Sequence, residues 1–528
     1  MDLKDAKAGY DALLAEAERK ATAGAASAAS VFAQVAAHSA AGRHPGFFRS
    51  ADLEALLSDL GARFVLPSAP VRRRRPGGSP RRRVLHVLTE AYSIGGHTKA
   101  LYRWIGADSA STHDVAITQQ VEPLPPALVD AVAAAGGRIR LLDGVENLIA
   151  VARDLRRMAD GADFIVLHVH PYDVVPLLAF GADQERPPTL VFNHADHVFW
   201  LGESICDCLV NFRRSGARLA AARRGLGPER SALLPLPLLP SSRPDAPGKT
   251  EARRILGLPA DAPISLTIAS EYKLVPNRRA DFFALHRPLF DADPEFRMVL
   301  VGPSATSAYW MERAAETGGR VHPMGMRSEL DLFTAAADVY LDSTPFASQT
   351  ALLEAVLDGL PAVSWRPYPA ESLSAVLASD DVALDDQPVI FHDAAAYLSQ
   401  VRALLADRSA AEALGRAQAN AIATLHWGPA WTDSLERTYE AAALNAADRP
   451  APSAPDQGPS DVDQDLLEFQ AGSRRGVAPE VQHFRFLPVR LQIATWARIP
   501  KEDRPPLKEF LPLRLRQRVR RAWSGMRR

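Results

Sequence analysis

The stretch LDSTPFASQTALLEAVLDGLPAVSW, residues 341 to 365, decides the fold of this chain. The apolar run Val339 to Leu341, closed by Asp342, is typical of a buried strand that ends in a loop. The loop contains Pro345, and the Ala- and Leu-rich run Thr350 to Leu357 after it predicts a helix. A Gly and a Pro end that helix, and a second apolar strand starts at Ala362. The order strand, loop, helix, strand predicts one unit of a parallel α/β sheet.

The loop that enters this helix is a candidate anion site. The first N–H groups of a helix lack partners within the helix, and they lie at the positive end of its dipole. Gln349 and Thr350 are placed to add side-chain donors there. Glu354, one turn further on, is placed to accept hydrogen bonds from paired hydroxyls such as those of a ribose. An ordinary α/β unit with a surface Glu would give the same pattern, so both interpretations stay open at this point.

The wording of the stretch, D-[ST]-x-P-F-x-x-x-T-x-x-[LM]-[DE]-A-x-x-x-G-x-P-x-V, resembles the donor-binding segment of nucleotide-sugar glycosyltransferases with two Rossmann-like domains, the GT-B fold. The resemblance is greatest to O-GlcNAc transferase and the bacterial HMW1C-like polypeptide glycosyltransferases. It implies that Gln349 and Thr350 contact a diphosphate and that Glu354 holds the ribose. Retaining GT-B enzymes with two Glu separated by seven residues would have the first at Phe346. The Phe therefore favours the O-GlcNAc-transferase-like pattern.

A second strand–loop–helix unit lies near the start of the chain, where EAYSIGGHTKALYRWI follows the apolar run Val84 to Thr89. Only glycine lets a backbone approach a ligand without a Cβ clash, so Gly95 and Gly96 predict a phosphate or acceptor loop. In the family that the chain resembles, a His in this loop lies near the phosphates and the acceptor, and His97 matches it. His97 is thus a candidate for acid/base chemistry or phosphate contact, and a solvent-facing His is the alternative.

Polar residues follow two more predicted strands, at HVHPYD and NHADHVFW. Because the carboxyl ends of parallel strands meet at one edge of a sheet, their side chains should gather there: His168, His170, His194, Asp196 and His197. Such residues could bind a metal. GT-B transferases, however, typically neutralise the diphosphate with helix ends and basic side chains, so we expect no metal and no cofactor.

Two of these residues are candidates for catalysis. His194 resembles the strand-end His of many GT-B first domains, near the donor sugar or the acceptor, and Asp196 is expected to orient it or stabilise its charge. His168 and His170 are expected to be hydrogen-bonded packing residues.

The second half has its own cationic candidate, in the segment ASEYKLVPN after the strand Ile264 to Ile268. The Lys273 ammonium, just past a strand end, suits the charge that grows on a leaving nucleotide diphosphate. O-GlcNAc-transferase-like enzymes have a Tyr-Lys pair at this point, and Tyr272 with Lys273 resembles it. Leu330 stands where O-GlcNAc transferase stacks a His on uracil. The resemblance therefore defines the identity of the donor's base less well than it defines the diphosphate site.

Composition fits a multidomain globular protein, with 528 residues, 47% of them hydrophobic and 23% charged. The net charge of −1 gives no general attraction to nucleic acid, and we expect no nucleic-acid partner. Cys206 and Cys208 are too few for a disulfide framework and are expected to be reduced. Without an apolar run of about 18 residues or a signal sequence, the expected location is the cytoplasm.

The alternation of elements predicts an α/β fold class with two Rossmann-like domains and extra segments at both ends. The expected parts are a helical N-terminal extension (1–70), an acceptor domain (82–240), a nucleotide-sugar donor domain (255–440), and a linker with a basic amphipathic tail (449–528). The Arg-rich residues 72–75 and 81–83 are expected in a flexible linker, and 449–462 in a disordered one.

The basic tail has a pattern of its own. Leu515, Val519 and Trp523 lie four residues apart among arginines. This suits peripheral contact with an anionic membrane, and the same charges suit plain solvation or an acidic partner.

The expected function is transfer of a sugar from a nucleotide sugar, of the UDP type, to a protein or glycan acceptor. A nucleotide-sugar 2-epimerase on the same fold is one alternative, which interconversion of two nucleotide sugars would reveal. A non-catalytic GT-B binding subunit is another, which would bind a nucleotide without consuming a donor.

Overall fold

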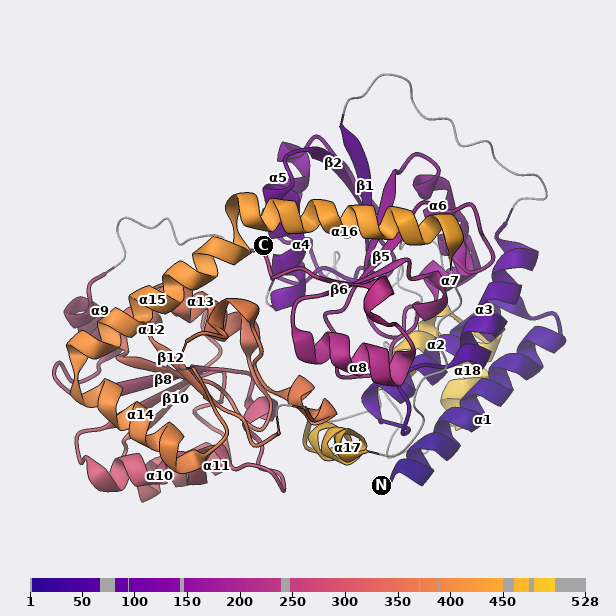
Figure 1. The fold of residues 1–528 in the computed structure, drawn as a ribbon. Coiled ribbons are helices and arrows are strands. Elements are labelled where there is room, and N and C mark those ends of the chain that lie inside the picture. Colours follow the sequence, from indigo (N-terminus) through magenta and orange to yellow (C-terminus); the bar gives the residue numbers. More distant parts are fainter. Residues whose placement is uncertain are drawn as a thin grey trace, which may run out of the picture.

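The computed structural model describes residues 2–66, 81–93, 95–142, 147–238, 247–369, 371–387, 389–449, 460–473 and 479–498. Two lobes lie side by side, and each is built around a parallel sheet with helices packed on it (Figure 1). A long helix that follows the second lobe, residues 428–448, runs back across the first.

The first lobe contains a seven-stranded sheet in the order β3-β2-β1-β4-β5-β6-β7, with all neighbours parallel. Its strands are β1 (Arg82–Leu88), β2 (Ser111–Ile117), β3 (Ile139–Leu141), β4 (Phe164–His168), β5 (Thr189–Phe192), β6 (Cys208–Asn211) and β7 (Ser231–Leu233). Its helices are α4 (Gly96–Ala107), α5 (Pro126–Ala134), α6 (Leu148–Ala159), α7 (Val175–Phe180) and α8 (Arg214–Arg224). The central strands are buried on both faces, which is why their apolar residues run continuously instead of alternating.

The second lobe repeats this plan with the sheet order β10-β9-β8-β11-β12-β13, again all parallel. Its strands are β8 (Ile264–Ile268), β9 (Arg297–Val301), β10 (Val321–Gly325), β11 (Val339–Leu341), β12 (Ala362–Trp365) and β13 (Ile390–Phe391). Its helices are α9 (Lys249–Leu256), α10 (Phe282–Ala292), α11 (Ala308–Glu316), α12 (Leu330–Ala336), α13 (Gln349–Leu357), α14 (Ala394–Ala406) and α15 (Arg408–His426).

Both sheets have the Rossmann strand order, which confirms the fold class expected from the sequence. In each sheet the order reverses between the first and the fourth strand in the chain, β1 and β4 in one, β8 and β11 in the other. Open α/β sheets bind their ligands outside the carboxyl ends of the strands at such a switch point. The fold therefore provides two ligand-binding edges.

Helix α16 (Gly428–Asp448) ties the chain's later part to the first lobe (Figure 1). The Trp431 indole N–H donates to Pro235 O at 2.8 Å, and Arg82 forms an ion pair with Glu436 at 2.5 Å. The prediction that residues 81–83 belong to a flexible linker is thus wrong, because Arg82 begins β1. The Arg82 guanidinium also lies 4.3 Å from the Tyr439 ring centre. Residues 72–75 lie outside the described ranges.

Three N-terminal helices, α1 (Leu3–Thr22), α2 (Ala26–Gly42) and α3 (Ala51–Phe64), confirm the expected helical extension. They pack on the first lobe, and most of α2 is buried. The Glu54 carboxylate of α3 accepts the backbone N–H groups of residues 202, 203 and 204. A Cβ at Gly61 would lie 2.5 Å from Leu178 O, so this glycine allows α3 to pack closely on α7.

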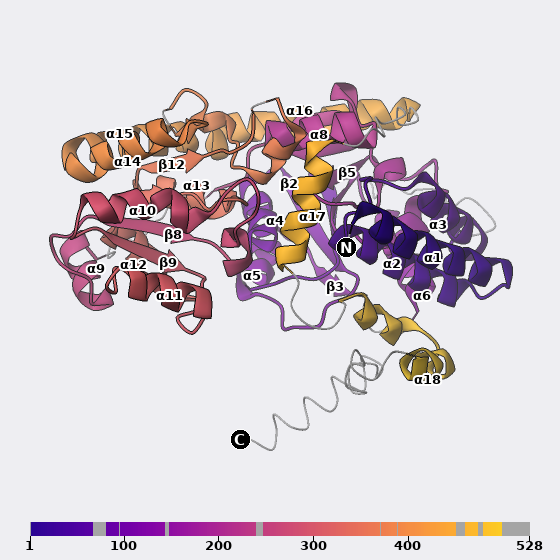
Figure 2. The ribbon, with the colours of Figure 1, turned by 90° about the horizontal axis from the view of Figure 1, so that it is seen from below.

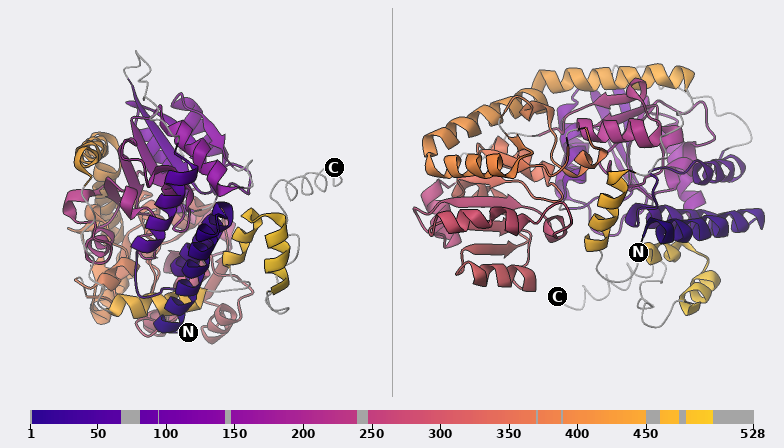
Figure 3. Two further views of the ribbon diagram at one scale, coloured as in Figure 1. Left: turned by 90° about the vertical axis from the view of Figure 1, so that its right-hand side faces the viewer. Right: turned by 60° about the horizontal axis from the view of Figure 1, so that its bottom comes forward.

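The chain continues after residues 450–459 into α17 (Asp461–Ser473), the 3-10 helix η6 (Pro479–Phe486) and α18 (Val489–Arg498). The expectation of disorder as far as Val462 is wrong at its end, since α17 already begins at Asp461. Helix α17 lies between the two lobes (Figures 2 and 3). Residues 499–528, including Leu515, Val519 and Trp523, lie outside the described chain, and their membrane contact stays a prediction.

Within the ranges given above, the structure contains no helix with both the length and the apolar character needed to cross a bilayer.

Candidate functional site

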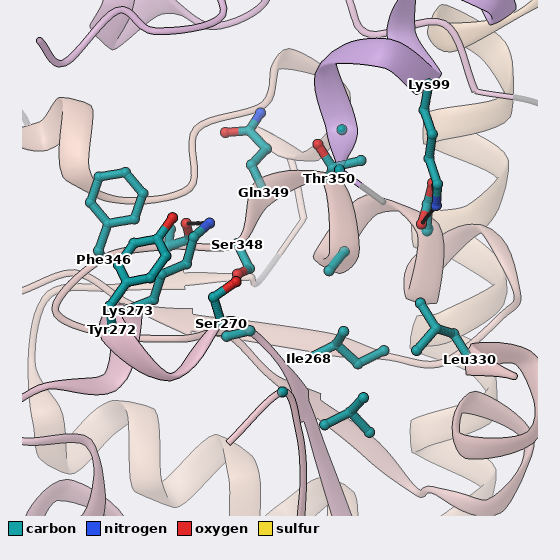
Figure 4. A pocket seen from close by; sticks show the side chains of 18 of the residues that line it. Lys99, Ile268, Ser270, Tyr272, Lys273, Leu330, Phe346, Ser348, Gln349 and Thr350 are labelled. Atoms are coloured by element: carbon teal, nitrogen blue, oxygen red, sulfur yellow. Dashed lines mark hydrogen bonds and ion pairs between the residues drawn. The ribbon is translucent and has the colours of Figure 1, made fainter. Parts of the chain in front are cut away.

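A cavity of about 380 Å³ lies where the carboxyl edges of the two sheets approach each other. The first lobe contributes Gly95, Gly96, Lys99, His194, His197, Phe212 and Arg213. The second lobe contributes Ile268–Ser270, Tyr272, Lys273, Val301, Gly302, Met326, Arg327, Leu330, Phe346–Ala351 and Glu354 (Figure 4).

Eight of the ten sequence-predicted site residues line this cavity. They are Gly95, Gly96, His194, Tyr272, Lys273, Gln349, Thr350 and Glu354. The other two, His97 and Asp196, are not among the described residues that line it. The structure therefore brings together residues that the sequence spreads over about half of the chain.

Two helix N-termini meet at the cavity, that of α4 from the first lobe and that of α13 from the second. A Cβ on Gly96 would lie 2.9 Å from Thr350 Oγ1, so the two helix starts approach closely at this glycine and a larger residue would displace Thr350. Gly95 has φ +127°, a conformation that L side chains rarely adopt. Within the described residues, no side chain caps either helix start. The first N–H groups of both helices thus remain available to an anion.

The loop between β11 and α13 is fixed by Asp342, which accepts hydrogen bonds from Ser343 N at 2.9 Å and Ser348 N at 3.3 Å. Its second oxygen accepts from Ser364 Oγ at 2.9 Å. Burial raises the pKa of this carboxyl, while these donors and nearby Lys273 act in the opposite direction. The loop is therefore held in shape before any ligand binds.

Lys273 lies in the 3-10 helix η3 (Glu271–Leu274), just past β8. Its Nζ donates to Ala347 O at 2.9 Å and lies 5.0 Å from the centre of the Phe346 ring. Burial lowers the pKa of Lys273 to about 8, with Asp342 raising it and Arg213 lowering it further. The group is still an ammonium at pH 7, and partial removal from water strengthens its attraction for an anion.

Gln349 lies at the cavity, but its side chain is already engaged. Its Nε2 donates to Asp380 O at 2.9 Å, and Asp380 N donates to its Oε1 at 3.1 Å. With the amide engaged in this way, Gln349 offers its backbone N–H at the start of α13, and its contact with a diphosphate stays a prediction. The same Asp380 accepts Ser215 N at 2.6 Å, at the start of α8, and so joins the two lobes.

Glu354 forms an ion pair across the lobes. Lys99 Nζ lies 3.2 Å from both carboxylate oxygens, and Arg103 Nη2 donates to one of them at 2.8 Å. Figure 4 shows the Lys99 side chain reaching down from α4 into this contact. Neither cation was predicted from the sequence, although Lys99 and Arg103 lie four residues apart and so on one face of the helix. A carboxylate has about four lone-pair sites, so Glu354 keeps capacity for a ligand hydroxyl.

His194 reaches the cavity, and His97 stacks behind it with ring centres 5.2 Å apart. The His194 Nδ1 lies 3.2 Å from Phe192 O, and the buried Nε2 of His97 has no hydrogen-bond partner in the described chain. Burial lowers the pKa of both groups, that of His97 well below its ordinary value, and neighbouring imidazoles add to the effect at His97. Both rings are therefore neutral at pH 7. His194, which reaches the cavity, is placed for proton transfer, whereas His97 lies behind it, and its lowered pKa disfavours the alternative role as a cationic phosphate contact.

Asp196 forms its hydrogen bonds with residues other than His194, so the expected orienting contact is absent from the described chain, although the charge of Asp196 does raise the pKa of His194 against burial. Both Asp196 oxygens bind Arg213 at 2.6 Å, and Oδ1 also lies 3.3 Å from Nδ1 of His197. Burial raises the pKa of Asp196, but Arg213 and His197 lower it more, to about 2. Asp196 therefore orients Arg213 and His197, which line the cavity. The polar FRRS segment after β6 was the sequence signal for Arg213.

The remaining strand-end histidines are hydrogen-bonded packing residues, as expected. His168 Nε2 lies 3.1 Å from His86 Nδ1, and His170 Nδ1 lies 2.8 Å from the Tyr172 hydroxyl. In the described part of the chain, no cluster of His, Cys, Asp and Glu is arranged to hold a metal ion, and Cys206 and Cys208 are buried free thiols.

No protein-family model matches the chain, and no curated protein matches it in sequence. Solved structures do match it. A mutant of the Thermobaculum terrenum O-GlcNAc transferase superposes with a TM-score of 0.52 at 18% identity, over 83% of each chain. A glycosyltransferase from Rickettsia africae superposes with a TM-score of 0.51 at 10% identity, over 69% of this chain and 99% of the other. The fold is GT-B.

In this GT-B chain, the cavity lies at the switch points of both Rossmann-like sheets at once. Both lobes contribute cations and one helix start to it, and its imidazoles come from the first lobe. The cations and helix starts can bind an anion, and the imidazoles can exchange a proton.

Proposed function

We propose that the protein transfers a sugar from a nucleotide-sugar donor, of the UDP-sugar class, to a hydroxyl or amide of a protein or glycan acceptor. The observation that supports this most is the convergence of two uncapped helix starts and the Lys273 ammonium on one cavity. Such a set of donors stabilises the negative charge that a leaving nucleoside diphosphate develops.

The cavity has room for the parts of the donor in a definite order. The diphosphate lies against Lys273 and the start of α13, and the ribose hydroxyls reach Glu354. Ile268 and Leu330 form an apolar side, away from Phe346 and Tyr272, for the base (Figure 4). The motif at residues 342–363, which resembles the O-GlcNAc-transferase-like pattern, supports this order and a hexosyl or N-acetylhexosaminyl donor.

The acceptor approaches from the first lobe, where His194 reaches the cavity. Its imidazole is neutral because burial lowers the pKa of His194, and with Nδ1 donating to Phe192 O, Nε2 takes the proton from the attacking group. Lys273 and the helix starts bind the leaving diphosphate without a metal ion. The chain's own residues therefore supply both charge stabilisation and proton transfer.

A ligand titration tests the donor class. Purified protein is heated with UDP, GDP or TDP, and with the matching sugar nucleotides, while the melting temperature is followed. A ligand that binds only the folded form at 100 times its Kd adds about 2.7 kcal/mol of stability, so UDP compounds should raise the melting temperature most. If no nucleotide raises it, the proposal fails.

Turnover separates the proposed activity from the other two candidates. Donor consumption that depends on an acceptor supports sugar transfer. Interconversion of two nucleotide sugars without an acceptor would instead establish a 2-epimerase. Tight UDP binding with no donor consumption over a broad panel of acceptors would establish a binding subunit.

A further inference from the structure

Helix α17 follows the last helix of the GT-B core, yet it lies between the two lobes near the cavity (Figures 2 and 3). Its contacts reach both lobes. Asp463 binds the Arg223 guanidinium of the first lobe through two hydrogen bonds of 3.0 Å, and His44 Nε2 lies 2.7 Å from it. The helix is thus anchored to the first lobe and to the N-terminal segment at one residue.

A second buried acid anchors α17 to the other lobe. Asp465 accepts Arg278 Nη2 at 2.5 Å, Arg279 Nε at 3.2 Å and Ser374 Oγ at 2.6 Å. Asp463 and Asp465 are 1% and 0% exposed, so both charges are paired out of water. Removing one partner of such a pair is costly, which indicates that α17 is a docked part of the fold.

The apolar side of α17 reaches the donor loop. Phe469 stacks on Phe346 with ring centres 4.3 Å apart and planes 13° apart, and it lies 5.8 Å from the Tyr272 ring. Val462 and Leu466 of α17 belong to the same apolar cluster as Phe346. Since Phe346 lies 5.0 Å from Lys273 Nζ, one ring separates α17 from the ammonium.

Helix α17 supports the cavity without filling it. Its residues are not among the described ones that line the cavity, which keeps its volume of about 380 Å³ with α17 in place. Docking of α17 is therefore compatible with an occupied donor site.

We propose that α17 is a strap that completes the donor site, and that Phe469 is a positioning residue that acts through Phe346 to hold Lys273 in place and keep water from it. The identity of the ligand rests on the proposed function, and the effect on Lys273 does not.

Charge and burial around Lys273 fit this role. Asp342 attracts the ammonium, Arg213 repels it, and His197 is close enough for Lys273 to lower its pKa. Burial is the largest influence on the pKa of Lys273, which is about 8. The Phe346–Phe469 stack adjoins the ammonium, so loss of the Phe469 ring should admit water and raise that pKa.

The first test measures the pKa of Lys273 by NMR, in full-length protein labelled with 13C at the lysine ε-carbon, with Lys273→Arg used for assignment. Phe469→Ala should raise the pKa by about one unit, because water reaches the ammonium. Gln464→Ala, on the exposed side of α17, should leave it unchanged. An unchanged pKa in folded Phe469→Ala overturns the proposal.

A second variant keeps the test decisive if Phe469→Ala does not fold. Phe469→Leu keeps most of the apolar volume and should give an intermediate rise in the pKa. Circular dichroism and the melting temperature establish which variants fold. If Phe469→Ala does not, the absence of any shift in Phe469→Leu overturns the proposal by itself.

The second test measures UDP binding by calorimetry with the same variants. Phe469→Ala should weaken binding about tenfold, Phe469→Leu should recover part of the loss, and Gln464→Ala should match the wild type. If the wild type binds no UDP while the pKa of Lys273 still responds to Phe469, the proposed function fails and the strap stands. If UDP binds and neither quantity responds, the strap fails and the proposed function stands.

Discussion

The two sides of the cavity differ in their titratable groups, although they are the same edge of two sheets with the same strand order. Both offer cations and a helix start, and the first lobe adds imidazoles whose pKa burial lowers. The second presents an ammonium, a helix start and a loop fixed by a buried carboxylate. The comparison teaches that strand order determines where a ligand binds, and that the residues after each strand determine which chemistry that edge performs.

The difference has a local cause in each lobe. Neighbouring strands of the first sheet bring His113, His86 and His168 into one chain of contacts, with ring nitrogens 2.9 and 3.1 Å apart. Burial lowers the pKa of all three, and the neighbouring rings lower that of His86 further. In the second lobe Asp342 lies close to Lys273 and opposes the effect of burial, so the cation is retained.

Removing the Lys273 ammonium should have the largest effect on activity. Lys273→Ala should lower kcat by about 100- to 1000-fold, the usual cost of losing one preorganised donor to a developing negative charge. The measurement is the rate of UDP release from a UDP-sugar in the presence of an acceptor. Lys249→Ala, which removes a lysine paired with Asp338 away from the cavity, is the matched control. Full activity in Lys273→Ala would show that Lys273 does not stabilise the leaving diphosphate.

The role of the first-lobe imidazole can be tested separately from that of Lys273. His194→Gln keeps a hydrogen-bonding side chain but cannot transfer a proton near pH 7. The expected result is a fall in kcat of about 100-fold with an unchanged Kd for UDP, because His194 handles the proton while Lys273 and the helix starts bind the nucleotide. Stopped assays give kcat and calorimetry gives the Kd. Parallel losses of melting temperature and activity would show that His194 acts only in packing.

The ion pair across the lobes gives a further test, since Glu354 is a second-lobe acid that binds Lys99 and Arg103 of the first lobe. Glu354→Gln should weaken UDP binding about tenfold, because an amide accepts hydrogen bonds from the ribose less strongly than a carboxylate. Pyrophosphate has no ribose, and it should bind at least as tightly as before because a nearby negative charge is gone. Calorimetry with both ligands measures this. Equal weakening of both would indicate that Glu354 shapes the cavity and does not contact ribose.

The sequence predicted most of the fold because the signals are local. Inner strands such as β4, β5, β8 and β9 contain apolar runs, and residues 339–365 contain strand, loop, helix and strand in succession. Loops at strand ends point to one edge, so Lys273 and His194 were found from their positions together with the family resemblance, and Glu354 was found from its place one turn into the helix after such a loop.

What the sequence missed depends on contacts between distant segments. Lys99 binds a carboxylate 255 residues away in the sequence. Asp196 binds Arg213 and not His194, its neighbour in the sequence, because a guanidinium binds both carboxylate oxygens at once. Helix α17 follows a Pro- and Ser-rich stretch and begins with acids, which resembles disorder. It is ordered by partners elsewhere in the chain, Arg223 and Arg278 among them.

One histidine outside the cavity gives the smallest and most specific test of why the first-lobe imidazoles are neutral. His426, at the end of α15, lies 2.9 Å from Asp381 Oδ1 through Nε2 and 2.7 Å from Leu236 O through Nδ1. Both partners are acceptors, so only the imidazolium satisfies them together. Burial lowers its pKa, but the charge of Asp381 and these hydrogen bonds outweigh burial, and the pKa of His426 is raised.

A raised pKa in the folded state means that the stabilisation is complete below the unfolded value of about 6.5 and is lost as pH rises through the folded value. His426→Gln should therefore lower the melting temperature by about 2 °C at pH 5.5, and the difference should shrink by pH 9. His286 is the matched opposite, because burial lowers its pKa to about 4 without a carboxylate partner. Its contribution is present above pH 6.5 and falls as pH drops, so His286→Gln should show the reverse trend in calorimetric scans over the same range. Identical pH trends for the two variants would contradict the view that a carboxylate neighbour decides which buried histidines of this chain are charged.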